Sequence, residues 1–227
     1  MPPEKSTIEQ RAILLVGGAG GLGSATAELL AAEGANVVVS SRSSGLRADI
    51  TKADDRKRLL DAVPKLYGLV VFAGAPARGA DEDAMRLSHE VNYQGPILLA
   101  RDAAQRMQAQ ATAGAIVLFS SMQAVALFPG STAYAGDKAA LLHAARILAK
   151  ECRGPANIRV NVIAPGVIEA GMALASIASG KYGRYLADGM IPRYGKALDV
   201  ARAVRFLLEP DNYITGQVLS VDGGITL

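Results

Sequence analysis

The sequence predicts an α/β fold, in which a doubly wound parallel sheet is flanked by helices on both faces within a single domain, residues 1–227. Three observations predict this class. Apolar runs of strand length alternate with segments of helical period along the whole chain. The runs are apolar throughout, which is typical of strands covered on both faces. Half of the residues are hydrophobic, so one sizeable core can form without disulfides or metals.

The elements follow in order from these runs and from turn signals. The predicted strands cover residues 12–16, 36–40, 69–72, 115–120, 159–164 and 217–221. A helix after the first strand ends at Gly34, a residue suited to the left-handed conformation past a helix end. Thr51 with Asp54 resembles a capping box, which predicts a helix up to about Val63. Further helices are predicted over residues 97–107, 133–152 and 198–208.

Composition excludes several classes of function. The 24 basic and 21 acidic residues are spread along the chain, and no Lys/Arg run is long enough for a nucleic-acid groove. Cys152 is the one cysteine, which excludes an intrachain disulfide and fits a reducing compartment; with two histidines, we expect no metal site. No signal peptide or run of about 20 apolar residues is present, so we predict a cytoplasmic protein without a membrane partner, with residues 1–10 flexible.

A glycine-rich turn follows the first strand and opens the first helix. Gly17 permits the tight turn, Gly21 lets the backbone approach a pyrophosphate, and Gly23 allows close packing of the helix on the sheet. The helix N-terminus adds free N–H groups and a partial positive charge. The alternative is a turn with only a conformational role. In this strand–turn–helix context we predict a Rossmann-like dinucleotide site that also includes Leu22.

The end of the second strand indicates which dinucleotide binds. Sites for the unphosphorylated ribose carry an Asp or Glu about 20 residues after the turn. Here Ser41 and Arg42 occupy that region, and a guanidinium with hydroxyls suits a 2′-phosphate. We therefore predict NADP as the cofactor, with NAD possible. The alternative is that Arg42 is a solvated surface residue.

The chemistry is indicated by Tyr134 and Lys138, which follow Ser121. Residues four apart lie on one helix face, one turn from each other. A free phenol has a pKa of about 10 and is a poor acid or base near neutrality. We expect the Lys138 ammonium to stabilise the Tyr134 phenolate and lower that pKa, so that the pair can exchange a proton at working pH.

Together these features resemble the short-chain dehydrogenase/reductase family, in its shorter, single-domain form, over nearly the whole chain. The ordered set is far more specific than any one motif. The further matching motifs are Asp49-Ile50, Phe72-Ala73-Gly74, Val91-Asn92, Asn161 with Pro165-Gly166, and Gly216-Gln217 with Asp222-Gly223-Gly224.

The resemblance implies a role for each of these positions. Ser121 orients the substrate oxygen, Tyr134 transfers the proton, Lys138 lowers the phenol pKa and holds the nicotinamide ribose, and Asn92 keeps a water in a relay to solvent. A hydride arriving at a carbonyl carbon builds negative charge on oxygen, which Ser121 and Tyr134 can stabilise. The remaining cofactor contacts implied are Asp49 and Ile50 at the adenine, Ala73 and Gly74 at the ribose, and Pro165, Gly166 and Ile168 at the nicotinamide.

The chain departs from the family pattern at several positions. Val16 replaces the usual Thr before the turn, and Ala170 replaces a Thr whose hydroxyl would meet the nicotinamide amide. Only six residues separate Arg42 from Asp49, where relatives fit a helix. We therefore expect an open adenine side and weak cofactor discrimination, with a preference below about a hundredfold, ~2.7 kcal/mol.

Three further features have structural and functional interpretations. Residues 170–194 are Gly-interrupted and carry apolar side chains, which suits a substrate lid or, alternatively, a passive surface excursion. His89, one turn before Asn92, is expected to have a capping or surface role; the alternative is that it tunes the relay. The helices over 97–107 and 139–148 are rich in Ala and Leu; the resemblance implies that they pack between subunits of a homo-oligomer, a dimer or tetramer.

The sequence thus favours an NADP(H)-dependent oxidoreductase that interconverts a ketone or aldehyde with an alcohol. The alternatives are an NAD-dependent alcohol dehydrogenase of the same family and a non-catalytic NADP-sensing binding protein. Sensing is disfavoured because the whole Ser121, Tyr134 and Lys138 set is present. Enoyl reduction is disfavoured because relatives with that activity space Tyr and Lys more widely.

Overall fold

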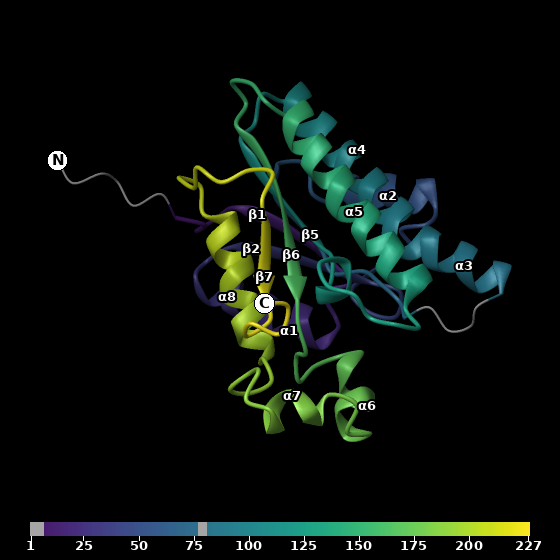
Figure 1. Ribbon diagram of the computed structural model, residues 1–227. Helices are drawn as coiled ribbons and strands as arrows, with labels where there is room; N and C mark the ends of the chain where they lie inside the picture. The colour runs from purple at the N-terminus through teal and green to yellow at the C-terminus, as the bar shows by residue number, and fades with distance from the viewer. Residues whose placement is uncertain (1–6, 77–80) are drawn as a thin grey trace.

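One sheet of seven parallel strands forms the centre of the protein, in the order β3-β2-β1-β4-β5-β6-β7 (Figure 1). The computed structural model describes residues 7–76 and 81–227. The predicted fold class, a doubly wound parallel sheet, is confirmed. The strands are β1 (Ala12–Val16), β2 (Asn36–Ser41), β3 (Leu46–Arg47), β4 (Leu66–Val71), β5 (Gly114–Phe119), β6 (Ile158–Pro165) and β7 (Val218–Val221).

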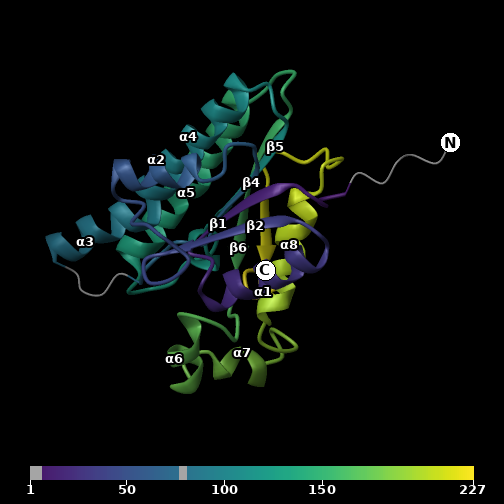
Figure 2. The ribbon, with the colours of Figure 1, turned by 180° about the vertical axis from the view of Figure 1, so that it is seen from behind.

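Helices cover both faces of this sheet, as Figures 1 and 2 show from opposite sides. α2, α4 and α5 lie on one face, with α3 beyond them, and α1 and α8 pack together on the other. The α-helices are α1 (Gly21–Ala32), α2 (Ala53–Asp61), α3 (Glu82–His89), α4 (Gly95–Ala109), α5 (Thr132–Glu151), α6 (Ala173–Ala178), α7 (Gly183–Ala187) and α8 (Ala197–Leu208). A π-helix (Glu90–Gln94) joins α3 to α4, and a 3-10 helix (Met122–Ala124) follows β5.

The alternation of side chains along β1 divides the core into two layers. Leu14 and Val16 join the apolar cluster under α2, α4 and α5, whereas Ile13 and Leu15 join the cluster under α1 and α8. β4 and β5 are buried at every residue, as expected for central strands of a sheet with two covered faces.

The chain reverses its direction of travel across the sheet between β1 and β4. From β1 it runs outward to β2 and β3, then crosses back to β4 and continues to β7. A crevice forms at such a reversal, at the carboxyl ends of the strands. Gly17, just after β1, has φ +78°, and a Cβ on it would lie 2.8 Å from the backbone N of Ala73, just after β4. Only glycine fits this close approach of the two strand ends.

The structure corrects several predicted boundaries. β4 begins at Leu66, three residues before the predicted start, and β3, α3, the π-helix, α6 and α7 were not predicted. The proposed capping box does not form: the N-cap of α2 is Lys52, and the Thr51 hydroxyl donates to Asp49 Oδ1 at 2.8 Å instead. Of the N-terminal segment expected to be flexible, residues 1–6 lie outside the described residues, and Ile8 is buried in the core.

The segment predicted as a substrate lid forms the short helices α6 and α7, below the carboxyl ends of the strands in Figure 1. Neither helix buries a residue fully. Their neighbours Tyr182 and Ile191 pack with Met122 in a small third cluster. Within the described ranges, no helix is both long enough and apolar enough to span a bilayer.

Candidate active site

A cavity of about 930 Å³ opens at the carboxyl ends of the strands. Ser121, Tyr134 and Lys138 line it, together with all of the residues predicted to bind a cofactor. Asn92 does not line this cavity; it is fully buried behind the wall. The predicted cofactor residues on the wall are Gly17, Gly21, Leu22, Gly23, Ser41, Arg42, Asp49, Ile50, Ala73, Gly74, Pro165, Gly166 and Ile168.

The glycine turn and the start of α1 form one end of the cavity. The N-cap of α1, Gly20, is extended, no side chain caps the helix, and its first turn carries no acidic residue. The backbone N–H groups there are available to an anion, and the helix dipole favours one. A Cβ on Gly23 would lie 2.3 Å from the Cα of Gly18, so the turn closes tightly on the helix. This end can hold a pyrophosphate.

The end of β2 forms the part of the cavity predicted to select the cofactor. The hydroxyl of Ser41 accepts from Ser44 N at 2.8 Å and donates to Ser44 O, so it holds the turn after β2. This contact differs from the predicted role of Ser41 as a phosphate ligand. Arg42 and Ser43 are exposed on the same wall. The short strand β3 lies in the six-residue connection between Arg42 and Asp49, where relatives fit a helix.

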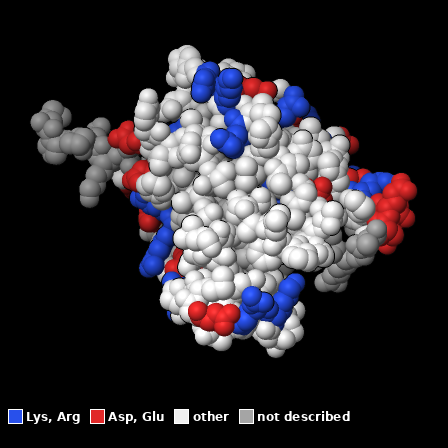
Figure 3. Space-filling view, in the orientation of Figure 1, with Lys and Arg blue, Asp and Glu red and all other residues white. Residues whose placement is uncertain are grey.

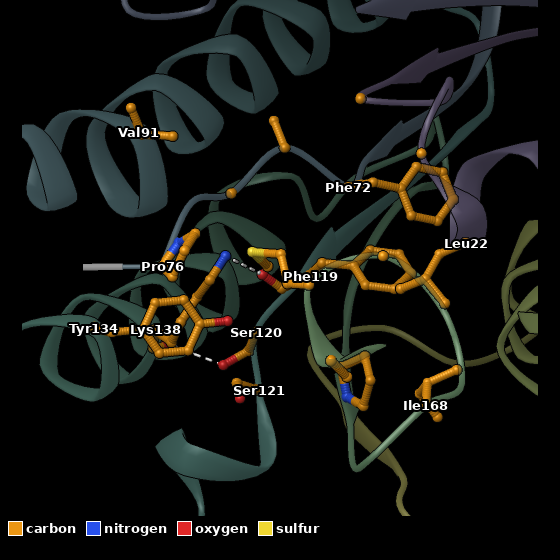
Figure 4. A pocket seen from close by; sticks show the side chains of 18 of the residues that line it. Leu22, Phe72, Pro76, Val91, Phe119, Ser120, Ser121, Tyr134, Lys138 and Ile168 are labelled. Carbon is orange, nitrogen blue, oxygen red and sulfur yellow. Dashed lines mark hydrogen bonds between the residues drawn. The ribbon is translucent and has the colours of Figure 1, made fainter. Parts of the chain in front are cut away.

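The catalytic candidates come from two adjacent elements. Ser121 lies two residues after β5 and caps the 3-10 helix, where its Oγ accepts from Gln123 N at 3.2 Å. Tyr134 and Lys138 lie one turn apart near the start of α5, and the Lys138 Nζ is 5.8 Å from the centre of the Tyr134 ring. Figure 4 shows the three side chains around the same part of the cavity. The predicted set is therefore brought together by β5 and α5.

The pKa of Tyr134 shifts in the direction opposite to our prediction. Burial raises the pKa of Tyr134, the neighbouring phenol of Tyr182 acts in the same sense, and a hydrogen bond with Ser121 opposes them. Lys138 is not among the causes of this shift. The phenol of Tyr134 is therefore protonated near neutral pH, which is the form that donates a proton.

Lys138 is 2% exposed, and its ammonium donates to the Phe119 carbonyl oxygen at 2.9 Å (Figure 4). Burial lowers the pKa of Lys138 to about 8, and the charge of Asp137 opposes this. Near pH 7 the side chain is mostly protonated, at roughly ten to one. The site thus holds a cation and a neutral phenol side by side.

Replacing Lys138 by Met should remove the part of the pH dependence of the free energy of unfolding that comes from the titration of Lys138. With a folded-state pKa of about 8 against an ordinary value of 10.5, the unfolded chain binds more protons between these values, so wild-type stability rises with pH there. Relative to Lys138→Met, we expect the free energy of unfolding to rise by on the order of 3 kcal/mol across this window. Urea titrations of both proteins at a series of pH values measure it; a difference independent of pH would contradict the burial of a charged Lys138.

Asn92 is held by the π-helix, which turns it toward the segment after β4. Its Oδ1 accepts from Ala75 N at 3.0 Å, and its Nδ2 donates to Ala75 O at 2.9 Å. A Cβ on Gly74 would lie 3.1 Å from Asn92 Oδ1 and 3.2 Å from Lys138 Nζ, so both polar groups face the backbone of Gly74. The structure thus brings Asn92 near Lys138, and the water relay itself stays a prediction.

Sequence reasoning found only part of the far wall of the cavity. This wall comes from the 3-10 helix, the loop after it, and the segment around α6, which falls within residues 170–194, predicted as a substrate lid. No residue-type pattern marks the part after β5, because its approach depends on loop conformation. The residues that form the whole wall include Met122, Gln123, Phe128, Ser131, Ser176, Lys181 and Tyr182.

The residues present fit a dinucleotide better than a metal. The glycine turn offers a cradle that a Cβ would fill at Gly17 or Gly23, and Arg42 offers a cation for a phosphate. Across residues 7–76 and 81–227, no group of three or more His, Cys, Asp or Glu side chains lies close enough together to hold a metal ion. A bound dinucleotide would lie along the wall from the glycine turn to Tyr134 and Lys138.

Comparisons with known proteins agree with this geometry. A family model described as "Enoyl-(Acyl carrier protein) reductase" matches residues 41–226. Carbonyl reductase family member 4 from Danio rerio is 34% identical over 242 residues, which cover 96% of this chain and 98% of that protein.

Two solved structures have the same fold over nearly their whole length. A short-chain type dehydrogenase/reductase from Mycobacterium ulcerans matches with a TM-score of 0.89 and 30% identity, covering 97% of this chain and 91% of that one. ElxO with NADP bound matches with a TM-score of 0.85 and 26% identity, covering 95% of this chain and 98% of that one. The chain therefore belongs to the short-chain dehydrogenase/reductase family.

Proposed function

We propose that this protein is an NADP(H)-dependent oxidoreductase that interconverts a ketone or aldehyde with an alcohol. The observation that carries the proposal is the convergence of Ser121, Tyr134 and Lys138 on the cavity that also contains the glycine turn. The carbonyl reductase from Danio rerio supports the reaction class, and ElxO with NADP bound supports the cofactor. The spacing of Tyr134 and Lys138 still argues against enoyl reduction.

A reduced nicotinamide, held along the wall between the glycine turn and Lys138, would supply a hydride to the carbonyl carbon of the substrate. Negative charge develops on the carbonyl oxygen, and the hydroxyls of Ser121 and Tyr134 stabilise it by donating hydrogen bonds. Tyr134 then transfers its proton to that oxygen, which its raised pKa permits near neutral pH. The ammonium of Lys138 stabilises the phenolate that remains. A protonated phenol near neutral pH is the form that reduction of the carbonyl requires.

Turnover separates this proposal from its alternatives. The purified protein is mixed with NADPH or, in a parallel series, with NADH, together with a panel of apolar ketones and aldehydes, and loss of absorbance at the reduced-nicotinamide band is followed. Oxidation of NADPH that depends on the carbonyl compound supports the enzyme. Tight NADPH binding without turnover across the panel would support a sensing protein, and turnover with NADH alone would support an NAD-dependent alcohol dehydrogenase.

The choice of cofactor is tested at Arg42. We expect Arg42→Gln to raise KM for NADPH roughly 10- to 100-fold, because a charge-assisted bond to a phosphate contributes about 1.5–3 kcal/mol, and to leave KM for NADH nearly unchanged. Arg47→Gln is the matched control, since Arg47 is exposed on β3 and does not line the cavity. Equal effects of Arg42→Gln on both cofactors would contradict recognition of the 2′-phosphate.

We also propose a homo-oligomer in the cytoplasm, assembled through the outer faces of α4 and α5. Figure 3 shows charged side chains gathered mostly toward the edges of the visible face, with uncharged residues across its middle. Ile147, on α5, is 48% exposed, so the outer face of this helix presents an apolar side chain that a second copy could cover. Light scattering of the purified protein measures the number of subunits, and a monomer at all concentrations would overturn this assignment.

A further inference from the structure

A chain of hydrogen bonds links the protein surface to the buried Asn92. His89, whose side chain is 52% exposed, lies with its Nδ1 3.1 Å from Asp137 Oδ1. The Ser88 hydroxyl donates to Asp137 Oδ2 at 2.5 Å and accepts from Asn92 Nδ2 at 3.2 Å. His89 was expected to have a capping or surface role; its side chain is half exposed, and the structure also gives it a carboxylate partner that the sequence did not indicate. Asp137 immediately precedes Lys138 on α5.

The chemistry of this network excludes its use as a proton wire. The single proton of the Ser88 hydroxyl is directed at Asp137, so Ser88 can only accept from Asn92. The Nδ2 of Asn92 already holds two hydrogens and has no lone pair for a third. A proton from His89 therefore stops at Asp137. The network can instead fix the orientation of the Asn92 amide, and it places the charge of Asp137 next to Lys138 in the chain.

The directions of these hydrogen bonds fix the orientation of the Asn92 amide. The Asp137 carboxylate can only accept, which fixes the direction of the Ser88 hydroxyl. That hydroxyl satisfies the second amide hydrogen of Asn92, whose Oδ1 is thereby kept toward Gly74 and the region of Lys138 Nζ. Ser88 and Asp137 are both nearly buried, at 3% and 9% exposure, so these bonds form where water does not compete well.

The second effect is that of the Asp137 charge on Lys138, the next residue of α5. Asp137 is the acidic group that favours the charged form of Lys138 against the effect of burial. We propose that Asp137 is a positioning residue for the reaction: it sustains the ammonium form of Lys138 and, through Ser88, fixes the amide of Asn92. This inference rests on the proposed function, because Lys138 and Asn92 act there on the reacting phenol.

Within the part of the chain that the structure describes, other titratable groups face this pair from α3, the π-helix, α5 and the far wall of the cavity. His89 faces Asp137 from α3, and Tyr93, on the π-helix, packs against the His89 ring at 4.9 Å between ring centres. Tyr134 lies beside Lys138 on α5, and Tyr182 approaches Tyr134 from the far wall of the cavity. Of these, the Asp137 carboxylate is the one placed to support a cation at Lys138.

The test is Asp137→Asn, which keeps the shape of the side chain and removes its charge. We expect the alkaline limb of kcat/KM for ketone reduction, set by Lys138 near pH 8, to move about one pH unit lower, with ketone KM unchanged near neutrality. The Nζ resonance of Lys138 in ¹⁵N NMR, assigned by its absence in Lys138→Met, should titrate with the same shift. This second readout needs no turnover, so it tests the inference even if the proposed reaction is wrong.

Matched variants separate charge from orientation. Ser88→Ala keeps the carboxylate, and should lower kcat roughly 2- to 10-fold at every pH without moving the limb, as expected for one lost hydrogen bond. Glu82→Gln removes an exposed carboxylate of α3 that pairs with Arg86, and should change neither readout. The proposal would be overturned if Asp137→Asn had the same alkaline limb of kcat/KM and the same Lys138 titration as the wild type, even if the variant were less stable.

If Asp137→Asn does not fold, His89→Arg provides the test. The half-exposed position accepts a longer side chain, and a permanent guanidinium would offset the charge of Asp137 without removing it. We expect the Lys138 titration to move lower in this variant as well, by less than in a variant without the carboxylate. An unchanged titration in a folded His89→Arg protein that pairs with Asp137 would contradict the role given to this charge.

Discussion

Replacing Tyr134 by Phe should lower kcat for ketone reduction by roughly 10²- to 10⁴-fold, the range typical for loss of a general acid. The substitution removes one hydroxyl and leaves the ring that packs beside Lys138 Nζ. The ammonium remains bonded to the Phe119 carbonyl oxygen, so the walls of the cavity are expected to stay in place. NADPH binding, followed by its fluorescence, should therefore change little, while turnover measured at the reduced-nicotinamide band falls.

Tyr194→Phe is the matched control for this variant. Tyr194 packs against the small third cluster and does not line the cavity, so loss of its hydroxyl should leave kcat near that of the wild type. Because burial raises the pKa of Tyr134, we also expect alcohol oxidation by the wild type to rise with pH, since that direction needs the phenolate. Wild-type turnover in Tyr134→Phe would exclude this phenol as the proton donor.

Gly23→Ala is expected to have the largest effect on the cofactor-binding end of the site. A Cβ at this position would lie 2.3 Å from the Cα and 2.6 Å from the carbonyl carbon of Gly18, so the backbone of the turn must move. Overpacking of this kind costs about 1–3 kcal/mol of stability. Displaced N–H groups should also weaken NADPH binding roughly 10- to 100-fold, the loss of about one charge-assisted hydrogen bond.

Gly20→Ala, three residues earlier, is the control for stability. Gly20 has φ −78°, which any residue adopts, and the nearest atom to an added Cβ is the Gly17 carbonyl oxygen at 3.6 Å, an ordinary contact. Thermal unfolding without cofactor should separate the two variants. Because Gly20 itself lines the cavity, NADPH titration compares Gly23→Ala with the wild type. Equal stability of Gly23→Ala and Gly20→Ala would show that the turn does not depend on the close contact of Gly23 with Gly18.

Local sequence patterns were sufficient to predict the fold class, although some short elements were missed. β1 was predicted with its observed bounds because a short apolar run, a glycine turn after it and a polar segment before it all agree. β3 could not be found, since two residues carry no periodicity, and its pairing with β2 depends on the turn held by Ser41. α6 and α7 were missed because neither contains enough helical residues to show a pattern.

The site was predicted where spacing alone determines geometry. Tyr134 and Lys138 share a helix face because they are four residues apart. The resemblance of the chain to a known family added Ser121 and Asn92. The direction of the pKa shift at Tyr134 could not be predicted, because it depends on burial in the folded protein and on the phenol of Tyr182, which is distant in sequence. The bond from His89 to Asp137 spans 48 residues, and no local pattern marks such a contact.

The brevity of β3 also affects how the protein behaves at high concentration. An outer strand presents unpaired N–H and C=O groups, on which a second molecule can add a strand and begin an aggregate. β3 has only two residues, and one of them, Arg47, has an exposed, charged side chain. Gly45, with φ +67°, turns the chain just before this strand. This border of the sheet is therefore a poor template for intermolecular strand addition, which leaves β7 as the border where such growth would have to start.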